Sequence, residues 1–274
     1  MTNPLRKRFY KEAAVGITDG GFAVLLDGRK VRTPKGRALC LPTETLAQAI
    51  ASEWGAQGDK IEPASMPLMQ LAATAIDRVA DERGAMRDAL LRYADTDLLC
   101  YRAAHPSDLV VRQTKLWQPV LDWAALTLDA ALLTTQGLAP ITQPEQALAA
   151  LARHLDRLDD WRFTALSVVT AATGSLLLGM ALLEGFLGKD QVIEASQLDE
   201  NHQSILWGED EEAQERLQAL ADEICAAEAF LRLLAQDRIT PSHPGDTELN
   251  VNPSLKQISR ADSRHQSKPF NGVD

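Results

Sequence analysis

The segment FTALSVVTAATGSLLLGMALL, residues 163–183, constrains the fold most, because it carries no formal charge over about the length that crosses a bilayer. It is rich in Ala, Thr, Ser and Gly, no basic cluster flanks it, and Glu184 follows at once. Membrane helices are usually dominated by larger apolar residues with Lys and Arg beyond one end. We therefore expect a buried central helix without membrane insertion, in which Gly174, Ser175 and Gly179 let neighbouring helices approach closely. The alternative, a membrane-spanning helix, predicts a protein that is insoluble without detergent.

The N-terminal residues alternate in polarity and contain turn signals that are typical of strands. In GFAVLLDGRKVRTPKGRALCLP, residues 21–42, the DG pair favours a tight hairpin and PKG marks a second turn. This pattern predicts a small antiparallel sheet. The period then becomes helical, with Leu46, Ile50 and Trp54 on one face. We expect Trp54 to be a structural residue, buried against the sheet.

The rest of the chain is predicted to be mainly helical, and the Pro-rich stretch at 139–144 marks a domain boundary. Segment 96–102 is expected to be a returning strand, and helices are expected after Ser65 and at 109–128, 145–157, 161–184, 190–207 and 210–235. The fold class is therefore α+β. Residues 1–140 form an N-terminal domain with a small antiparallel sheet and helices, residues 141–236 an all-α helical bundle, and residues 237–274 a disordered tail.

The charge and the absent motifs exclude several classes of function. A formal net charge of -10 argues against a nucleic-acid binder, because that affinity depends on clustered Lys and Arg. No glycine-rich phosphate-binding loop occurs, so ATP use is not expected. No cofactor is predicted. Cys40, Cys100 and Cys225 are widely spaced without a CxxC pair, which fits a reducing cytoplasm and gives no zinc site.

Asp95 and Asp97 are the first candidates for a reactive site. Two residues apart, they would point to the same side of a strand and could hold a divalent cation. Two carboxylates alone make a weak metal site, and the favoured interpretation is that they end a helix and bond turn amides. The enzyme alternative is metal-assisted chemistry that uses these carboxylates and those at 199–200 in a cleft between the two domains.

The stretch LDENHQSILWGEDEEA, residues 198–213, is the second candidate. On a helix, Leu198, His202, Ile205 and Leu206 share one side, whereas Glu200, Gln203, Ser204 and Trp207 share the other. An acid–base pair between His202 and Glu200 would therefore have poor geometry. The polar side suits a protein-contact surface. The pattern leaves a second interpretation open, in which Trp207 packs under the next helix and the acidic run supports that helix's N-terminus.

The chain resembles the ATP12 family, assembly chaperones of the F1 part of ATP synthase, over about Leu5 to Leu234. The motifs that carry this resemblance are RFYKEA, LLDGRKVRTPKG, LPTETLAQAIASEWGAQGDKIEPASMPLMQLAATAIDRV, YADTDLLCYR, LWQPVLDWA, ATGSLLLGMALLEG and LDENHQSILWGEDEEA. In this order they are highly specific, although each one alone is weak. The resemblance implies an α+β domain followed by a helical domain.

The resemblance also implies a function and a set of functional residues. The expected activity is to bind the free F1 α subunit until it pairs with β, without consuming ATP, in the cytoplasm of a bacterium. The family marks the acidic residues of DEN, here Asp199 and Glu200, and the tryptophan of EWGAQG, here Trp54. The predicted partner-binding set is Asp199, Glu200, Gln203, Trp207, Glu209 and Asp210. No role is transferred to His202, whose position is more often aromatic in the family.

Overall fold

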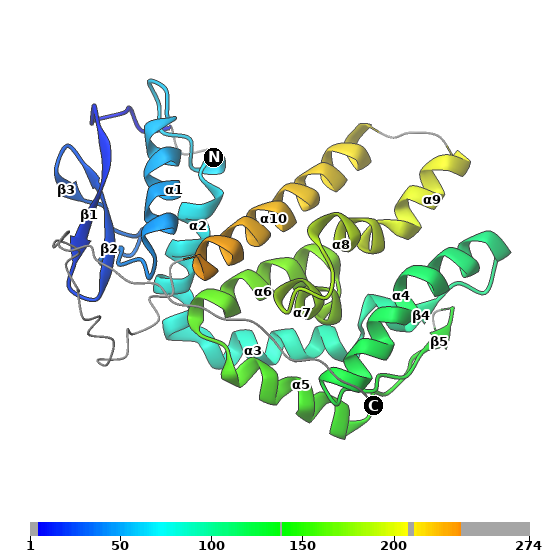
Figure 1. Ribbon diagram of the computed structural model, residues 1–274. Coiled ribbons are helices and arrows are strands. Elements are labelled where there is room, and N and C mark those ends of the chain that lie inside the picture. Colours follow the sequence, from blue (N-terminus) through cyan, green and yellow to red (C-terminus); the bar gives the residue numbers. More distant parts are fainter. Residues whose placement is uncertain (1–4, 138, 208–210, 237–274) are drawn as a thin grey trace, which may run out of the picture. The chain divides into compact units, whose positions relative to one another are not determined.

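The structure, a computed structural model, describes residues 5–137, 139–207 and 211–236. Its N-terminal part holds a small sheet covered by a helix, and helices make up most of the remainder (Figure 1). The predicted α+β class is confirmed.

Three antiparallel strands, β1 (Ala13–Thr18), β2 (Gly21–Leu26) and β3 (Arg29–Lys30), lie in the order β1-β2-β3. The DG pair forms the β2–β3 turn with positive φ at both Asp27 and Gly28, 48° and 78°, as a type I′ hairpin turn requires. On one face of the sheet, Val24 and Leu26 are buried where α1 contacts β1 and β2. The predicted hairpin is confirmed.

Helix α1 (Glu44–Gly55) begins at Thr43, whose side chain accepts a hydrogen bond from the Leu46 amide. Leu46 and Ile50 are fully buried. Trp54 differs from the expectation, because it lies in the last turn of α1 and is only half-buried. Its ring packs edge-on against Tyr10 with centroids 5.7 Å apart, and the Tyr10 hydroxyl donates to the Trp54 carbonyl at 2.7 Å. A structural role for Trp54 stays a prediction.

A long helical stretch follows, as predicted after Ser65, and it contains a π-helical turn. Its parts are the 3-10 turn Pro63–Ser65, α2 (Pro67–Thr74), the π-helical turn Ala75–Val79 and α3 (Ala80–Asp95). Within the π-helical turn, buried Asp77 accepts hydrogen bonds from the Thr33 hydroxyl at 2.7 Å and the Lys35 amide at 3.0 Å. Lys35 Nζ and an Arg37 guanidinium nitrogen donate to the carbonyls of Asp77 and Ile76. The basic turn 33–37 therefore stabilises the π-helical turn through these hydrogen bonds.

The remaining elements are mostly helices close to the predicted ranges. They are the 3-10 turn Leu98–Cys100, β4 (Tyr101–Arg102), α4 (Ser107–Thr127), β5 (Thr135–Gln136), α5 (Glu145–Arg157), α6 (Asp160–Thr173), α7 (Leu176–Leu183), α8 (Lys189–Ser196), α9 (Leu198–Trp207) and α10 (Glu211–Ala235). Strand β4 is shorter than the predicted strand at 96–102 and pairs in parallel with β5. The predicted helix at 190–207 is two helices, α8 and α9.

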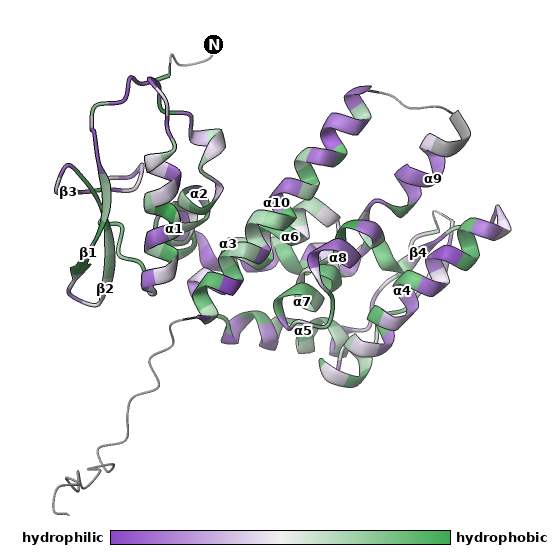
Figure 2. Cartoon of the chain, turned by 45° about the horizontal axis from the view of Figure 1, so that its top comes forward, coloured by the Kyte–Doolittle hydropathy of each residue, from purple (hydrophilic) through white to green (hydrophobic). Residues whose placement is uncertain are grey.

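The prediction of one helix over 161–184 is wrong, because α6 ends at Gly174 and α7 starts after Ser175. Gly174 takes the left-handed conformation, φ 68°, and the Ser175 side chain caps α7 by accepting from the Leu178 amide. Helix α7 is apolar along its length (Figure 2), yet no helix in the described ranges is long and apolar enough to cross a membrane. The uncharged segment is instead the centre of the core.

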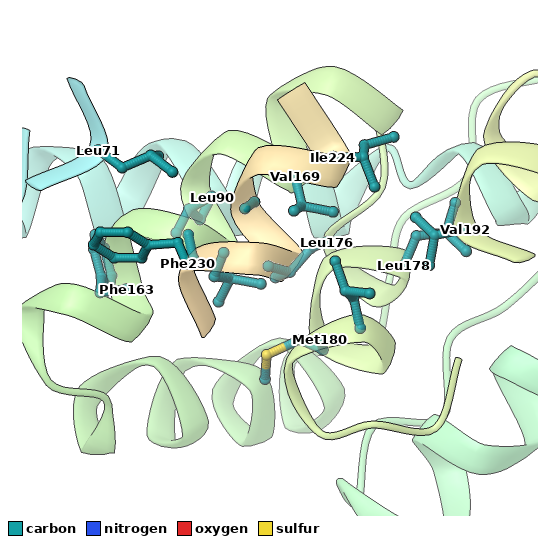
Figure 3. Close-up of a cluster of buried hydrophobic side chains, with 14 of the residues drawn as sticks. Leu71, Leu90, Phe163, Val169, Leu176, Leu178, Met180, Val192, Ile224 and Phe230 are labelled. Atoms are coloured by element: carbon teal, nitrogen blue, oxygen red, sulfur yellow. The ribbon is translucent and has the colours of Figure 1, made fainter. Parts of the chain in front are cut away.

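Helices α6, α7 and α10 form this core, where Phe163, Leu176, Ile224 and Phe230 are fully buried (Figure 3). Gly179 is the contact point of α6 and α7, since a Cβ there would lie 2.8 Å from both Leu166 Cδ1 and Thr170 Oγ1. The expectation that Gly179 permits close helix approach is confirmed.

Helix α10 also reaches the N-terminal part of the fold. The hydroxyls of Thr43 and Thr45 both donate to the Leu233 carbonyl, at 3.0 and 2.9 Å. The division of the chain into domains at residue 140 stays a prediction, and the predicted tail, 237–274, lies outside the described residues.

Candidate functional site

Helix α9, which carries most of the predicted partner-binding residues, is positioned through α8 and α4. Trp117 of α4 is fully buried and its Nε1 donates to the Ala195 carbonyl of α8 at 2.9 Å. The Arg102 guanidinium lies over the Trp117 ring, 5.3 Å from its centroid. This contact fixes the end of α8 from which α9 continues.

A buried glutamine links α4 directly to α9. Gln113, 1% exposed, donates through Nε2 to Asp199 Oδ1 at 2.8 Å. Its Oε1 accepts from the Ala103 amide at 2.8 Å, and its backbone carbonyl accepts from Arg102 at 3.0 Å. Because both ends of the Gln113 amide are used, the orientation of Asp199 is set by the scaffold and not by solvent.

His202 is a second contact between α9 and α4. It is buried, 5% exposed, and its Nδ1 lies 3.8 Å from Oδ2 of Asp108, in the first turn of α4. Leu198 is buried on the same side of α9. The predicted inward side of the helix is therefore correct for Leu198 and His202.

The opposite side of α9 is exposed and polar. Glu200 and Gln203 are exposed, and Asp199 is half-buried at their margin; we call these three residues the α9 polar face. Within the described ranges, no Lys or Arg side chain forms an ion pair with Glu200. Trp207 is the last residue of α9, and Glu209 and Asp210 lie outside the described residues. Whether these residues bind a partner stays a prediction.

The first turns of α10 continue the acidic character of α9. Glu211, Glu212 and Glu215 are exposed, and the part of α10 nearest α9 is hydrophilic (Figure 2). The Gln197 side chain, at the junction of α8 and α9, donates to the Leu217 carbonyl of α10 at 2.8 Å. A surface of carboxylates and amides on two neighbouring helices suits the recognition of basic and polar groups on another protein.

The other candidate, Asp95 with Asp97, is not an exposed carboxylate pair. Asp95 is exposed at the end of α3, whereas Asp97 is fully buried. Asp97 accepts from the Ser175 hydroxyl at 2.7 Å and from the amides of Leu99 and Leu177, both at 3.1 Å. The interpretation that Asp97 bonds turn amides is confirmed. The described part of the chain contains no cluster of three or more His, Cys, Asp or Glu that could hold a metal ion.

The buried position of Asp97 makes the stability of the fold depend on pH. Burial raises the pKa of this carboxyl from 3.8 to about 6, against the hydrogen bonds from Ser175 and the Leu177 amide, which favour the charged form. The folded chain thus binds this proton more tightly than the unfolded chain. The stability that comes from this bound proton is therefore fully present below about pH 4 and is lost as the pH rises through about 6, whereas the hydrogen bonds to the ionised carboxylate remain at neutral pH.

The test compares urea denaturation of the wild-type chain with that of Asp97→Asn, which cannot titrate at this position. We expect the difference in unfolding free energy, wild type minus variant, to decrease between about pH 4.5 and about pH 7. A difference that grows over this range would contradict the assignment.

Gln113 and Asp108 are site residues that were not among the residues predicted from the sequence. Gln113 follows Leu109 and precedes Trp117 at a spacing of four residues, so it falls in the apolar stripe of α4. A single polar residue in such a stripe indicates a buried hydrogen-bond partner. That signal was present in the sequence, but it could not identify Asp199 as the partner.

The chain is similar in sequence and in structure to proteins described as ATP12. A family model described as ATP12 chaperone protein matches residues 7–125. The crystal structure of Atp12 from Paracoccus denitrificans matches with a TM-score of 0.79 at 39% identity, over 84% of this chain and 98% of that one. The crystal structure of the Atu1473 protein from Agrobacterium tumefaciens matches with a TM-score of 0.79 at 41% identity, over 85% of this chain and 88% of that one. The mitochondrial protein atp12 of Schizosaccharomyces pombe is 26% identical over 227 residues, 78% of each chain.

Proposed function

Because the chain belongs to the ATP12 family of F1-ATPase assembly chaperones, we propose that it binds the free α subunit of F1. In this proposal the chaperone shields the surface through which α pairs with β and releases it on assembly, without hydrolysing ATP. Its setting is the cytoplasm of a bacterium, which corresponds to the mitochondrial matrix for eukaryotic relatives.

The observation that carries the proposal is the α9 polar face. Asp199 is oriented by Gln113 and the opposite side of the helix is buried through Leu198 and His202, so Glu200 and Gln203 are presented on a supported helix. Glu200 has no ion-pair partner in the described part of the chain, and its charge is therefore available to a basic group of a partner.

The polar character of this face also suits a temporary complex. A chaperone has to cover a subunit interface and then give it up, whereas permanent interfaces are large and predominantly apolar. Carboxylate contacts at an interface favour fast association and selection of the partner over very high affinity. Asp199, Trp207, Glu209 and Asp210 complete the proposed binding set beside Glu200 and Gln203.

Charge reversal at Glu200 tests the proposal. We expect Glu200→Lys to weaken capture of the α subunit by about tenfold or more, because it replaces attraction of a basic group by repulsion. The melting temperature should stay nearly unchanged, since exposed substitutions usually alter stability by about 0.5 kcal/mol or less. The measurements are the melting temperature and the recovery of soluble α subunit that is co-expressed with the variant.

Glu145→Lys is the matched control. Glu145 is an exposed residue in the first turn of α5. Glu145→Lys therefore changes the charge by the same amount as Glu200→Lys and should lower the stability of a helix N-terminus to a similar extent. Capture should persist in this variant. Equal capture by both variants would place the α-binding surface elsewhere, and a large fall in melting temperature for Glu200→Lys would give Glu200 a structural role.

A further inference from the structure

The outer edge of β1 carries main-chain groups that no strand pairs with among the described residues. On β2, Phe22 bonds in both directions to Leu41, and the Val24 carbonyl accepts from the Val31 amide. The main-chain groups of the odd-numbered residues of β2 therefore point toward β1. In the register, these residues lie opposite Ala14, Gly16 and Thr18. The amides and carbonyls of Ala13, Val15 and Ile17 consequently point outward from the sheet.

Among the residues that the structure describes, this edge lacks the features that usually prevent strand pairing. Natural edge strands are protected by charged residues, proline, bulges or a covering element. The sequence of β1 is AAVGIT, without charge or proline, and its register with β2 runs through all six residues without a bulge. An unprotected edge of this kind is a template for an extended chain.

Ile17 adds an uncovered apolar side chain to the same edge. It is 86% exposed, although it lies opposite Phe22 on the side of the strand that also carries Val15. Val15 and Phe22 pack against the core, whereas Ile17, next to the hairpin end, extends beyond it. A strand added along β1 would cover Ile17 and pair its main-chain groups at the same time.

We propose that the outer edge of β1 binds an extended segment of the F1 subunit that the chaperone holds, by addition of that segment as a fourth strand. This inference rests on the proposed function for the identity of the partner. Only an extended backbone presents donors and acceptors at the spacing of Ala13, Val15 and Ile17. A second copy of this chain is disfavoured as the occupant, because a strand of six mostly small residues is a short contact for an interface that needs roughly 1,200 Å² by itself. The F1 subunit of the proposed function is bound at the α9 polar face as well, so the strand edge need not hold it alone.

Two variants test the edge without breaking the β1–β2 pairing. Val15→Pro removes an outward amide and places the proline ring where the added strand would lie, which an edge strand tolerates. Ile17→Lys puts a charge at the exposed position, as natural protected edges do. We expect each variant to weaken capture of the α subunit by about tenfold. The melting temperature should stay near normal for Ile17→Lys and fall modestly for Val15→Pro, because Val15 packs against the core. Leu126→Lys is the control, because Leu126 of α4 is 88% exposed, and it should capture normally.

Amide hydrogen exchange on the wild-type complex gives an independent readout. Binding should slow exchange at Ala13, Val15 and Ile17, whereas Ala14, Gly16 and Thr18 are already protected by β2 in the free chain. Such alternation supports strand addition. Unchanged exchange at the three residues, or normal capture by both edge variants, overturns the inference and leaves the proposed function standing. Slowed exchange in the free chain that grows with its concentration would make a second copy the occupant. Absence of capture by the wild type contradicts the proposed function itself.

Discussion

Replacing Asp97 by Ala is expected to lower the free energy of unfolding by about 3–5 kcal/mol at neutral pH. Three buried donors would lose their acceptor: they are the Ser175 hydroxyl and the amides of Leu99 and Leu177. Water cannot replace the carboxylate readily, because Asp97 is fully buried. The start of α7 would also lose the negative charge that favours a helix N-terminus.

Urea denaturation measures this loss, with Asp95→Ala as its control. Asp95 is two residues away in the sequence and exposed, so its replacement should change the free energy of unfolding by about 0.5 kcal/mol or less. Similar denaturation midpoints for the two variants would show that Asp97 does not hold α7 in place.

Truncation of Trp117 is expected to have a comparable effect and to reach the candidate binding surface. Trp117→Ala removes a fully buried ring, which typically costs about 3–5 kcal/mol, and it leaves the Ala195 carbonyl without its donor. Because this contact fixes the end of α8 before α9, capture of the α subunit should decline together with stability.

Trp123→Ala provides the comparison within the same helix. Trp123 is half-buried and stacks on Phe186 with centroids 5.0 Å apart, so its loss should cost clearly less, about 1–2 kcal/mol. The measurement is the denaturation midpoint of both variants with the recovery of co-expressed α subunit. Equal losses of stability would contradict the central position of Trp117.

Local patterns in the sequence predicted most elements, because their causes lie within a few residues. The helix predicted at 145–157 is α5 with the same bounds, since its apolar period and the proline before it are local signals. The break between α6 and α7 was missed. Asp97, which accepts from Ser175 and the α7 amide of Leu177, comes 78 residues earlier than Ser175, and no local pattern reports such a contact.

Prediction of the candidate site from the sequence was limited in the same way, to what one helix determines by itself. Helical projection correctly separated exposed Glu200 and Gln203 from buried Leu198 and His202, because the period of one helix determines that division. It could not show that Gln113 orients Asp199 across 86 residues of sequence. It also placed Trp54 on the inner stripe of α1 without showing that this stripe is only half-covered in the last turn.

The π-helical turn Ala75–Val79 changes the direction in which the side chains of the following helix, α3, point. A π-helical turn accommodates about one residue more than an α-helical turn, and one residue corresponds to about 100° of rotation around the axis. The side chains of α3 are therefore rotated relative to a straight continuation of α2. That rotation directs Arg83 to Asp160 and to the Leu158 carbonyl, and Arg87 to Asp156. The basic turn 33–37, far from α5 and α6 in the sequence, thus helps to set which face α3 presents to them.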